Sequence, residues 1–177
     1  MGNNSGLFMQ TLQAIRSRRS IRKFTGKEIP DEIITKLLEA AMYAPSARNT
    51  QPWHFVLINR REILDKIPHL HPYAEMCYKA GAAILVCGDS ETEKLEGYIA
   101  LNCGAATQNI LLAAHDLGLG AVWLGVYPRK ERTEPLSLLF NLPPHIIPVS
   151  LIALGYPGEK IATPERFKAE KIHYNVW

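Results

Sequence analysis

Apolar residues recur along the chain with two periods, one typical of helices and one typical of strands. Between residues 31 and 43 they fall three and four positions apart, which predicts an amphipathic helix with one buried face. Pro30 and the two acids after it stand where a helix N-terminus favours them, and Pro45 stops the pattern. A shorter helical pattern over 7–16 precedes this helix.

Short apolar runs predict four strands, at 53–58, 82–87, 121–124 and 146–154, the last broken internally by Pro148. Helical patterns separate them, at 61–67, 73–80, 98–117 and 130–140, with a Pro/His-rich bend at 68–72. The longest of these helices is apolar on nearly every side, which is typical of a helix buried at a domain centre or a subunit interface. Strands separated by helices predict an α/β or α+β class with one mixed sheet.

The last segment, 155–177, is rich in glycine, proline and charge, and we expect an extended C-terminal arm. Such an arm, together with an all-apolar helix in a small chain, predicts a dimer with exchanged arms. At 177 residues the length favours a single domain over 1–177, with 1–6 as a loose tail.

Composition narrows the classes of function. An apolar fraction of 47% with 21% charged residues is ordinary for a soluble globular protein. A net charge of +3 is too mild for a typical nucleic-acid binder, and no apolar run approaches the roughly 18 residues of a membrane span. Three cysteines without a C-x-x-C pair indicate a reducing compartment, so we expect a cytoplasmic protein.

The basic stretch Ser17–Phe24 carries four cations and two hydroxyls within eight residues. Arginine binds phosphate bidentately and stays charged, so this stretch has the groups of a phosphate site. The alternative is a solvated helix end with cations placed against the helix C-terminus, and charge alone favours it. No glycine-rich P-loop or G-x-G-x-x-G is present, so a nucleotide would not be bound in the Walker or Rossmann manner.

Three further positions have two interpretations each. The loop 44–52 carries hydrogen-bonding side chains that could line a flat heterocycle, or it is an ordinary connection. Asn102, inside the apolar helix, contacts either a ligand or a neighbouring helix or backbone group. Gly125, at a strand end, either lets a ligand plane approach or belongs to a simple turn before Pro128.

The familiar sets of catalytic side chains are absent from the sequence. It has no G-x-S-x-G and no outstanding pair of acids. His69 and His71 lie in a proline-rich bend with no cysteine near, so we expect no metal site. Cys77 and Cys103 stand in apolar surroundings and are interpreted as core thiols. An enzyme without acid, base or nucleophile often relies on a cofactor for its chemistry.

Four segments, in this order and spacing, resemble the nitroreductase family of FMN-dependent oxidoreductases. They are Arg18–Phe24, Ala44–Phe55, Leu119–Gly125, and the tail formed by Gly155–Pro157, Arg166–Phe167 and His173–Trp177. The resemblance runs from about Leu7 to Trp177 and implies an α+β fold with a central mixed sheet. It also implies an intertwined homodimer with two FMN sites at the subunit interface.

The resemblance further implies roles for particular residues. Arg18 and Arg166 resemble phosphate-binding residues, Arg19 and Ser20 resemble contacts to phosphate or ribityl groups, and Arg22 resembles the cation at the N1/C2 edge of the flavin. The loop residues Pro45, Ser46, Ala47 and Asn49 resemble those that reach the flavin from the other subunit, with Ala47 where many relatives carry serine. Leu124 and Gly125 resemble the segment near N5, and Asn102 a helix residue near the pocket.

The activity implied by the resemblance is electron transfer from NAD(P)H to a small-molecule acceptor, namely a nitroaromatic, a quinone or an activated alkene. The flavin carries the chemistry in a ping-pong cycle. The protein positions the reactants, tunes the flavin and excludes competing reactions. The insertion that covers the pocket of many relatives is barely present between Val126 and Leu142, which leaves the acceptor class open. Two alternatives remain: a non-catalytic FMN-binding or sensing protein, and a basic interaction module using 16–23.

Overall fold

A four-stranded sheet lies at the centre of the computed structural model, which describes residues 10–177. In spatial order its strands are β1 (Trp53–Ile58), β2 (Ala82–Asp89), β4 (Ile146–Gly155) and β3 (Gly120–Gly125). Each of these strands runs antiparallel to its neighbours. Parallel pairing enters only through a bridge between Ser20 and Ala121, within the described part of the chain.

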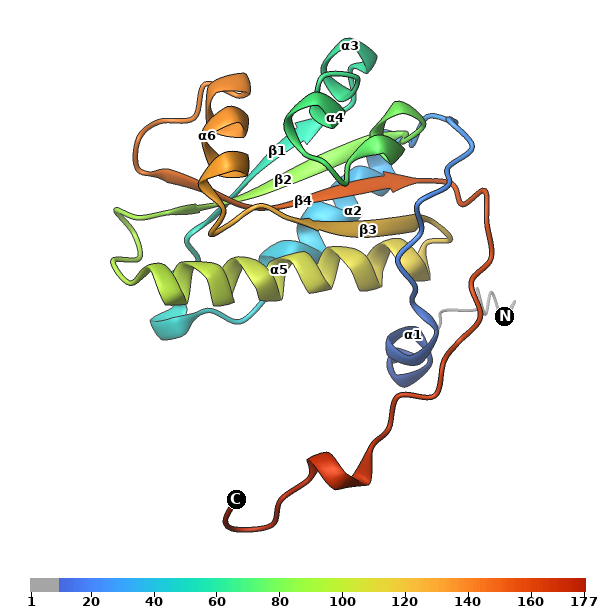
Figure 1. Ribbon diagram of the computed structural model, residues 1–177, viewed down its shortest axis with the longest axis vertical. Helices are drawn as coiled ribbons and strands as arrows, with labels where there is room; N and C mark the ends of the chain where they lie inside the picture. The colour runs from blue at the N-terminus through green and yellow to red at the C-terminus, as the bar shows by residue number, and fades with distance from the viewer. Residues whose placement is uncertain (1–9) are drawn as a thin grey trace, which may run out of the picture.

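Helices cover both faces of the sheet (Figure 1). On one face lie α2 (Asp31–Met42) and α5 (Glu96–Asp116), and on the other lie α3 (Arg61–Leu64), α4 (Ile67–Leu70) and α6 (Lys130–Leu139). The chain also forms α1 (Thr11–Ser17) and three 3₁₀ turns, η1 (Ala47–Asn49), η2 (Glu75–Tyr78) and η3 (Ala169–Lys171). This mixture of helices and one sheet confirms the predicted α+β fold class.

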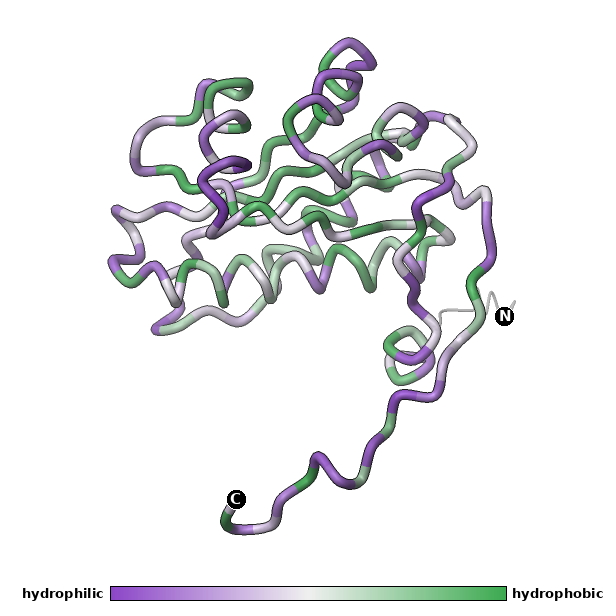
Figure 2. The backbone as a smooth tube through the Cα atoms, in the orientation of Figure 1, coloured by the Kyte–Doolittle hydropathy of each residue, from purple (hydrophilic) through white to green (hydrophobic). Residues whose placement is uncertain are grey.

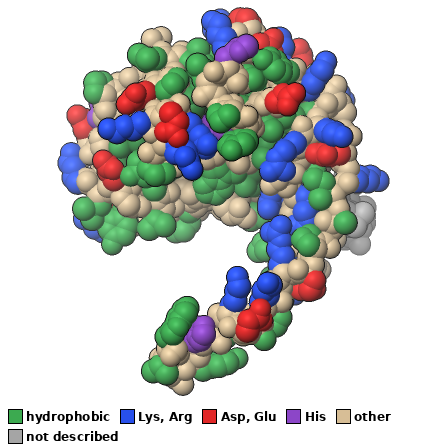
Figure 3. Space-filling model, in the orientation of Figure 1, with side chains coloured by type: hydrophobic (Ala, Val, Ile, Leu, Met, Phe, Trp, Pro, Cys, Tyr) green, Lys and Arg blue, Asp and Glu red, His purple; other side chains and the backbone are tan. Residues whose placement is uncertain are grey.

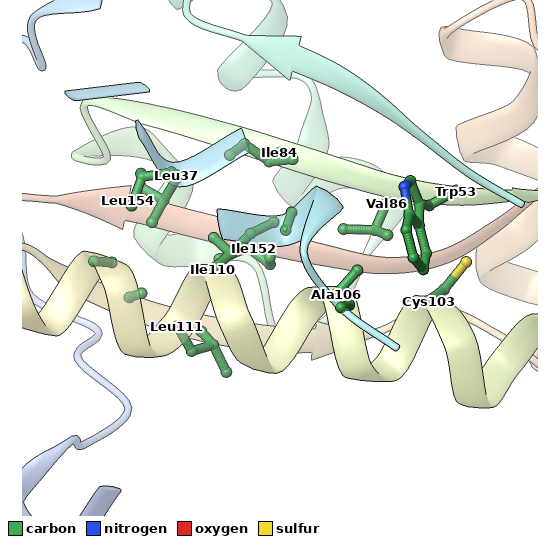
Figure 4. Close-up of a cluster of buried hydrophobic side chains, with 14 of the residues drawn as sticks. Leu37, Trp53, Ile84, Val86, Cys103, Ala106, Ile110, Leu111, Ile152 and Leu154 are labelled. Atoms are coloured by element: carbon green, nitrogen blue, oxygen red, sulfur yellow. The ribbon is translucent and has the colours of Figure 1, made fainter. Parts of the chain in front are cut away.

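Two hydrophobic clusters hold the layers together, one on each face of the sheet. In the first, Leu37 of α2 and Ile110 of α5 pack against Ile84 and Ile152 of the central strands (Figure 4). The second cluster fills the space between the opposite face and Leu136 of α6. The central strands are buried on both faces, which explains why their sequences are apolar throughout.

The long apolar helix is only partly covered by its own chain. Its sheet-facing side is buried, through Ile99, Cys103, Ala106 and Ile110, whereas Leu101 remains 68% exposed. Exposed large apolar side chains on an otherwise buried helix are typical of an interaction surface. The apolar character noted in the sequence therefore exceeds what packing within one chain requires.

Several predicted elements differ in detail from the structure. The predicted break at Pro148 is wrong, because β4 continues through it; the register passes from Ser150 opposite Val86 to Pro148 opposite Cys87, which leaves Val149 as an extra residue. Of the predicted bend 68–72, the first residues belong to α4, because a helix tolerates Pro68 in its first turn. The predicted helix 73–80 is only a 3₁₀ turn. The start of the predicted helix 7–16 lies outside the described residues.

The basic stretch crosses one end of the sheet, and two glycines allow it to lie close. A Cβ on Gly120 would come 2.7 Å from Ile21 Cγ2, and one on Gly155 would come 2.8 Å from Phe24 Cδ1. The Ile21 N–H donates to the Ala121 carbonyl at 3.0 Å, and Phe24 bridges to Pro157. The first part of the tail is thereby joined to the stretch that precedes α2.

Beyond Lys160 every residue of the tail is exposed. The tail runs away from the body, and hydrophilic residues predominate along it with apolar residues interspersed (Figures 1 and 2). Within residues 10–177, no helix combines the length and the apolar character that crossing a membrane would require.

Candidate functional site

Three arginines gather where α1, the basic stretch and the tail meet. Arg18 directly follows α1, and the pKa of its guanidinium is lowered by burial and by the charges of Arg19 and Arg166. Among residues 10–177, no ion pair engages any of these three side chains. Like charges held together without an acidic partner form a site for an anion. Figure 3 shows basic side chains along the tail and where it leaves the body.

Two cavities adjoin this arginine cluster. One, of about 410 Å³, is lined by Arg18, Arg19 and residues of α5 and the tail. The other, of about 650 Å³, is lined by Arg16, Arg19 and the tail around Arg166. Arg19 thus faces both cavities, but its donors already reach the backbone carbonyls of Arg16, Arg18 and Ala162. In this structure Arg19 ties the tail to α1, and its predicted contact with the cofactor stays a prediction.

Ser20 and Arg22 lie beyond the cluster along the same stretch. Ser20 forms the bridge to Ala121, so β3 fixes its position. Arg22 lines a separate cavity of about 680 Å³, together with Met76 and Glu159. The Glu159 carboxylate accepts the N–H groups of Arg22 and Lys23 at 2.6 and 3.0 Å, which fastens the basic stretch to the tail.

The loop Pro45–Asn49 is held firmly by side chains from two other segments. The Ala47 N–H donates to Asn102 Oδ1 at 3.1 Å, and the Ser46 hydroxyl accepts the Gln51 N–H at 3.0 Å. Arg48 and Asn49 adopt left-handed backbone conformations, with φ of 54° and 56°. Such conformations cost non-glycine residues about 1–3 kcal/mol each and cluster at functional sites.

Asn102 therefore has a defined structural contact in this chain. It is buried, its oxygen is used by the loop, and its Nδ2 is a buried donor with no partner among the described residues. A buried polar group without a partner calls for an explanation, and a group outside this chain would provide one. The contact with a neighbouring backbone group is thus present, and the contact with a ligand stays a prediction, for which Nδ2 is the available atom.

Gly125 ends β3 with open space beside it. A Cβ at this position would have no neighbour within 4 Å, unlike the tightly packed Gly120 and Gly155. Leu124, the residue before it, is buried in the second cluster and holds the strand end in place. The Gly125 carbonyl accepts hydrogen bonds from His71 Nε2 at 3.0 Å and Arg132 Nη1 at 2.7 Å.

One group of metal-ligating side chains occurs away from these residues. Asp89, Glu91 and His145 place one ligand atom each within 4.8 Å of one another. The Asp89 carboxylate already accepts the Glu91 N–H and the Thr92 hydroxyl, at 2.7 and 2.6 Å.

The predicted site residues form three groups in one chain, of which Leu124 and Gly125 at the end of β3 are one. The arginines lie with the tail at one end of the sheet, whereas the loop Pro45–Asn49 packs against Asn102 on α5. Neither cavity lined by the clustered arginines includes a residue of that loop. Sequence reasoning also missed two buried side chains, His71 and Glu93. His71 hydrogen-bonds the Gly125 carbonyl, and Glu93 accepts hydrogen bonds from Arg48 in the loop.

Comparison with known proteins identifies the family. The Nitroreductase family matches residues 15–72 and 69–156. The chain belongs to the nitroreductase family. A protein from Methanothermobacter thermautotrophicus, named "Putative NADH dehydrogenase/NAD(P)H nitroreductase", is 52% identical over 96% of this chain and 88% of its own length.

Solved structures agree with this family and this fold. A crystal structure from Parabacteroides distasonis, bearing the same name, superposes with a TM-score of 0.91 at 40% identity, over 96% of this chain and 99% of that one. A "putative nitroreductase in complex with FMN" from Desulfovibrio desulfuricans gives a TM-score of 0.81 at 37% identity, over 94% and 96% of the two chains. The resemblance stated from the sequence and the nitroreductase fold are thereby confirmed.

The groups at this nitroreductase's candidate site fit FMN. Clustered guanidinium groups without acidic partners suit a phosphate, and the open space beside Gly125 leaves room for a flat ring. The loop Pro45–Asn49, whose backbone is held in a fixed conformation, lies apart from the arginines. The protein groups at this site are therefore of the kind that bind a phosphate and a flat heterocycle.

Proposed function

We propose that this chain is an FMN-dependent oxidoreductase that takes electrons from NAD(P)H and passes them to a small-molecule acceptor. The observation that carries the proposal is the convergence of Arg18, Arg19 and Arg166 without an acidic partner in residues 10–177. Membership of the nitroreductase family and a relative in complex with FMN support the same assignment.

The residues have distinct proposed roles toward FMN. Arg18 and Arg166 hold the phosphate, Ser20 and Arg19 lie along the ribityl chain, and Arg22 places a cation at one edge of the ring. Gly125 faces the ring, because the space where a Cβ would stand is open. Bound FMN would supply hydride acceptance and electron donation in alternate half-reactions, so that donor and acceptor use one open site in turn.

The second half of the site belongs, in this proposal, to a second copy of the chain. The loop Pro45–Asn49 lies apart from the arginines in one chain, and α5 exposes Leu101 and Tyr98. A homodimer that buries this face would bring the partner subunit's loop to the flavin. Three free, buried cysteines suit a reducing compartment such as the cytoplasm.

The acceptor class follows from what covers the site. The connection from β3 to β4 holds a single short helix, α6, and no longer insertion. An open flavin face would admit nitroaromatics, quinones and activated alkenes alike. We therefore propose a broad acceptor range, with nitro reduction as one activity among several.

The experiment is an FMN titration of the purified protein, followed by NADH and NADPH oxidation with each acceptor class. Arg18→Ala should weaken FMN binding by about 1.5–3 kcal/mol, roughly 10- to 160-fold, because it removes a charge-assisted contact. Arg60→Ala is the matched control, since Arg60 is an exposed arginine away from the site. A protein that binds FMN but is reduced by neither nicotinamide would support the non-catalytic alternative. A protein that binds no FMN would overturn the proposal.

A further inference from the structure

Two cationic or imidazole donors from different segments converge on one backbone carbonyl at the end of β3. His71, which follows α4, contacts the Gly125 oxygen through Nε2 at 3.0 Å. Arg132, in α6, donates to the same oxygen through Nη1 at 2.7 Å. Both segments lie on the α6 side of the sheet, so the end of β3 is held from that side.

The tautomer of His71 follows from its second contact. The Tyr73 N–H donates to His71 Nδ1 at 3.3 Å, so Nδ1 is the acceptor and Nε2 carries the hydrogen given to Gly125. Only 1% of His71 is exposed. Burial, and to a lesser degree the charge of Arg132, lowers its pKa, so the ring is neutral near pH 7. The buried imidazole therefore acts as a fixed donor.

His71 and Arg132 restrain the peptide group of Gly125, which has no side chain of its own to pack as its neighbour Leu124 does. Glycine has more backbone freedom than any other residue, and no atom lies within 4 Å of where a Cβ would stand. The Ala121 carbonyl points to the edge of β3 away from β4, where it accepts the Ile21 N–H. Because backbone groups two residues apart point the same way, the Gly125 N–H and carbonyl also point to that open edge.

One donor of the Arg132 guanidinium is both buried and unused. Its Nε is buried and has no hydrogen-bond partner among residues 10–177. Its guanidinium also lies over the Tyr73 ring, 5.5 Å from the centroid, which holds the side chain beside Gly125. A half-buried cation with one buried, unused donor thus stands next to the peptide group at the strand end.

We propose that His71 and Arg132 are positioning residues that fix the Gly125 peptide for the flavin ring, and that the charge of Arg132 increases the electron affinity of that ring. This inference rests on the proposed function, in which Gly125 faces FMN. Holding the carbonyl fixes the glycine dihedral angles and hence the direction of the neighbouring N–H. A cation beside a bound flavin would favour the negative charge that the flavin takes up on reduction.

The test uses full-length protein loaded with FMN and three readouts: the midpoint potential of the bound flavin, its visible absorbance and circular dichroism, and FMN affinity. Arg132→Met should shift the potential to more negative values and change the spectrum. Arg129→Met is the matched control, because Arg129 also lies at the start of α6 but pairs with Glu131 on the surface. Equal potentials and spectra in these two variants would overturn the proposal.

His71 is tested with a pair of substitutions. His71→Gln keeps a donor near the position of Nε2 and should retain the wild-type spectrum, whereas His71→Leu should change it. Should His71→Leu fail to fold, the comparison of Arg132→Met with Arg129→Met still decides the matter. Identical flavin spectra in the Gln and Leu variants would contradict the role of His71.

A readout without flavin separates this inference from the proposed function. In the apo protein, hydrogen exchange of the Val126 amide, which shares a peptide group with the Gly125 carbonyl and donates to the Val149 carbonyl at 3.3 Å, should become faster in Arg132→Met than in Arg129→Met. Faster exchange together with a wild-type protein that binds no FMN would overturn both the flavin role and the proposed function. Normal FMN binding with unchanged exchange and unchanged potential would overturn this inference alone.

Discussion

Arg48 Nη2 lies 2.9 Å from a Glu93 carboxylate oxygen, although 66% of the arginine side chain is exposed and none of the glutamate is. The second Glu93 oxygen is 3.0 Å from the same nitrogen, and the Leu95 N–H donates to the carboxylate at 3.0 Å. One buried acid thus joins the left-handed loop around Arg48 to the turn that enters α5. The loop geometry is fixed before any partner or ligand arrives.

We expect Glu93→Gln to loosen the loop without unfolding the chain. The amide would keep an acceptor for Leu95 but lose the charge that holds Arg48, so the strained backbone would relax. Limited proteolysis should cut near Arg48 faster in the variant, and FMN affinity should fall with it. Arg60→Met, which removes an exposed arginine paired with Glu62, is the control. Equal cleavage rates in the two variants would contradict this role of Glu93.

The ion pair of Arg48 and Glu93 should make the fold less stable at acid pH. The hydrogen bond from the Leu95 N–H, followed by the contact with Arg48, lowers the pKa of Glu93. A carboxyl whose folded pKa is depressed stabilises the fold above its unfolded pKa of about 4.3, and this contribution is lost as the pH falls. Urea unfolding from pH 6 to pH 3 should therefore show a smaller loss of stability in Glu93→Gln than in the wild type.

Much of the fold could be predicted from the sequence because apolar runs bounded by turn residues define their own ends. The strand Trp53–Ile58 has the predicted bounds, since Pro52 precedes it and polar residues follow. The prediction at Pro148 was wrong because proline has no N–H to donate to a neighbouring strand, which usually interrupts a strand. Here a bulge beside Pro148 lets β4 continue.

The site was less accessible to sequence reasoning. Arginines near the start of the chain and Arg166 could be grouped only through a family resemblance. His71 was missed because its partner is a backbone carbonyl 54 positions away, which leaves no pattern in the sequence. Glu93 was missed because an acid in a polar turn looks like any solvated charge, and its burial depends on where Arg48 folds.

Gly120→Ala tests how closely the basic stretch must lie on β3. The new methyl group would stand 2.7–2.8 Å from two Ile21 atoms, so the stretch that carries Arg18 must shift. We expect a loss of about 1–3 kcal/mol in the free energy of unfolding, from overpacking, with weaker FMN binding. Gly97→Ala, at an open helical position of α5, should be neutral or stabilising by up to about 1 kcal/mol. Equal effects of the two changes would contradict the packing argument.

Removing the arm after Thr163 tests the proposed dimer. The deletion keeps Glu159 and Ala162, which hold Arg22 and Arg19, but removes Arg166 and five exposed apolar side chains. Those side chains are Phe167, Ile172, Tyr174, Val176 and Trp177. Light scattering should show monomers, and bound flavin should be lost. Arg166→Ala in the full chain should remain dimeric while losing FMN affinity. A truncated protein that stays dimeric and yellow would contradict the exchanged arm.

His115 should couple acid sensitivity to anion binding. Its Nε2 lies 2.7 Å from the Ser17 hydroxyl, and its pKa is lowered by burial and then by Arg18 and Arg19. The unfolded chain, with a histidine pKa near 6.5, therefore binds more protons, so stability falls as the pH drops below about 6.5. His71 contributes in the same direction, so His115→Gln should remove only part of this slope.

Inorganic phosphate supplies the decisive comparison for His115. An anion held by Arg18 and Arg19 would offset their charges and raise the pKa of His115 toward its ordinary value. Thermal unfolding of the apo protein between pH 7.5 and 5.5 should thus depend less steeply on pH when phosphate is present, and His115→Gln should abolish most of that difference. The same phosphate effect in His115→Gln and the wild type would show that this imidazole does not sense the arginine cluster.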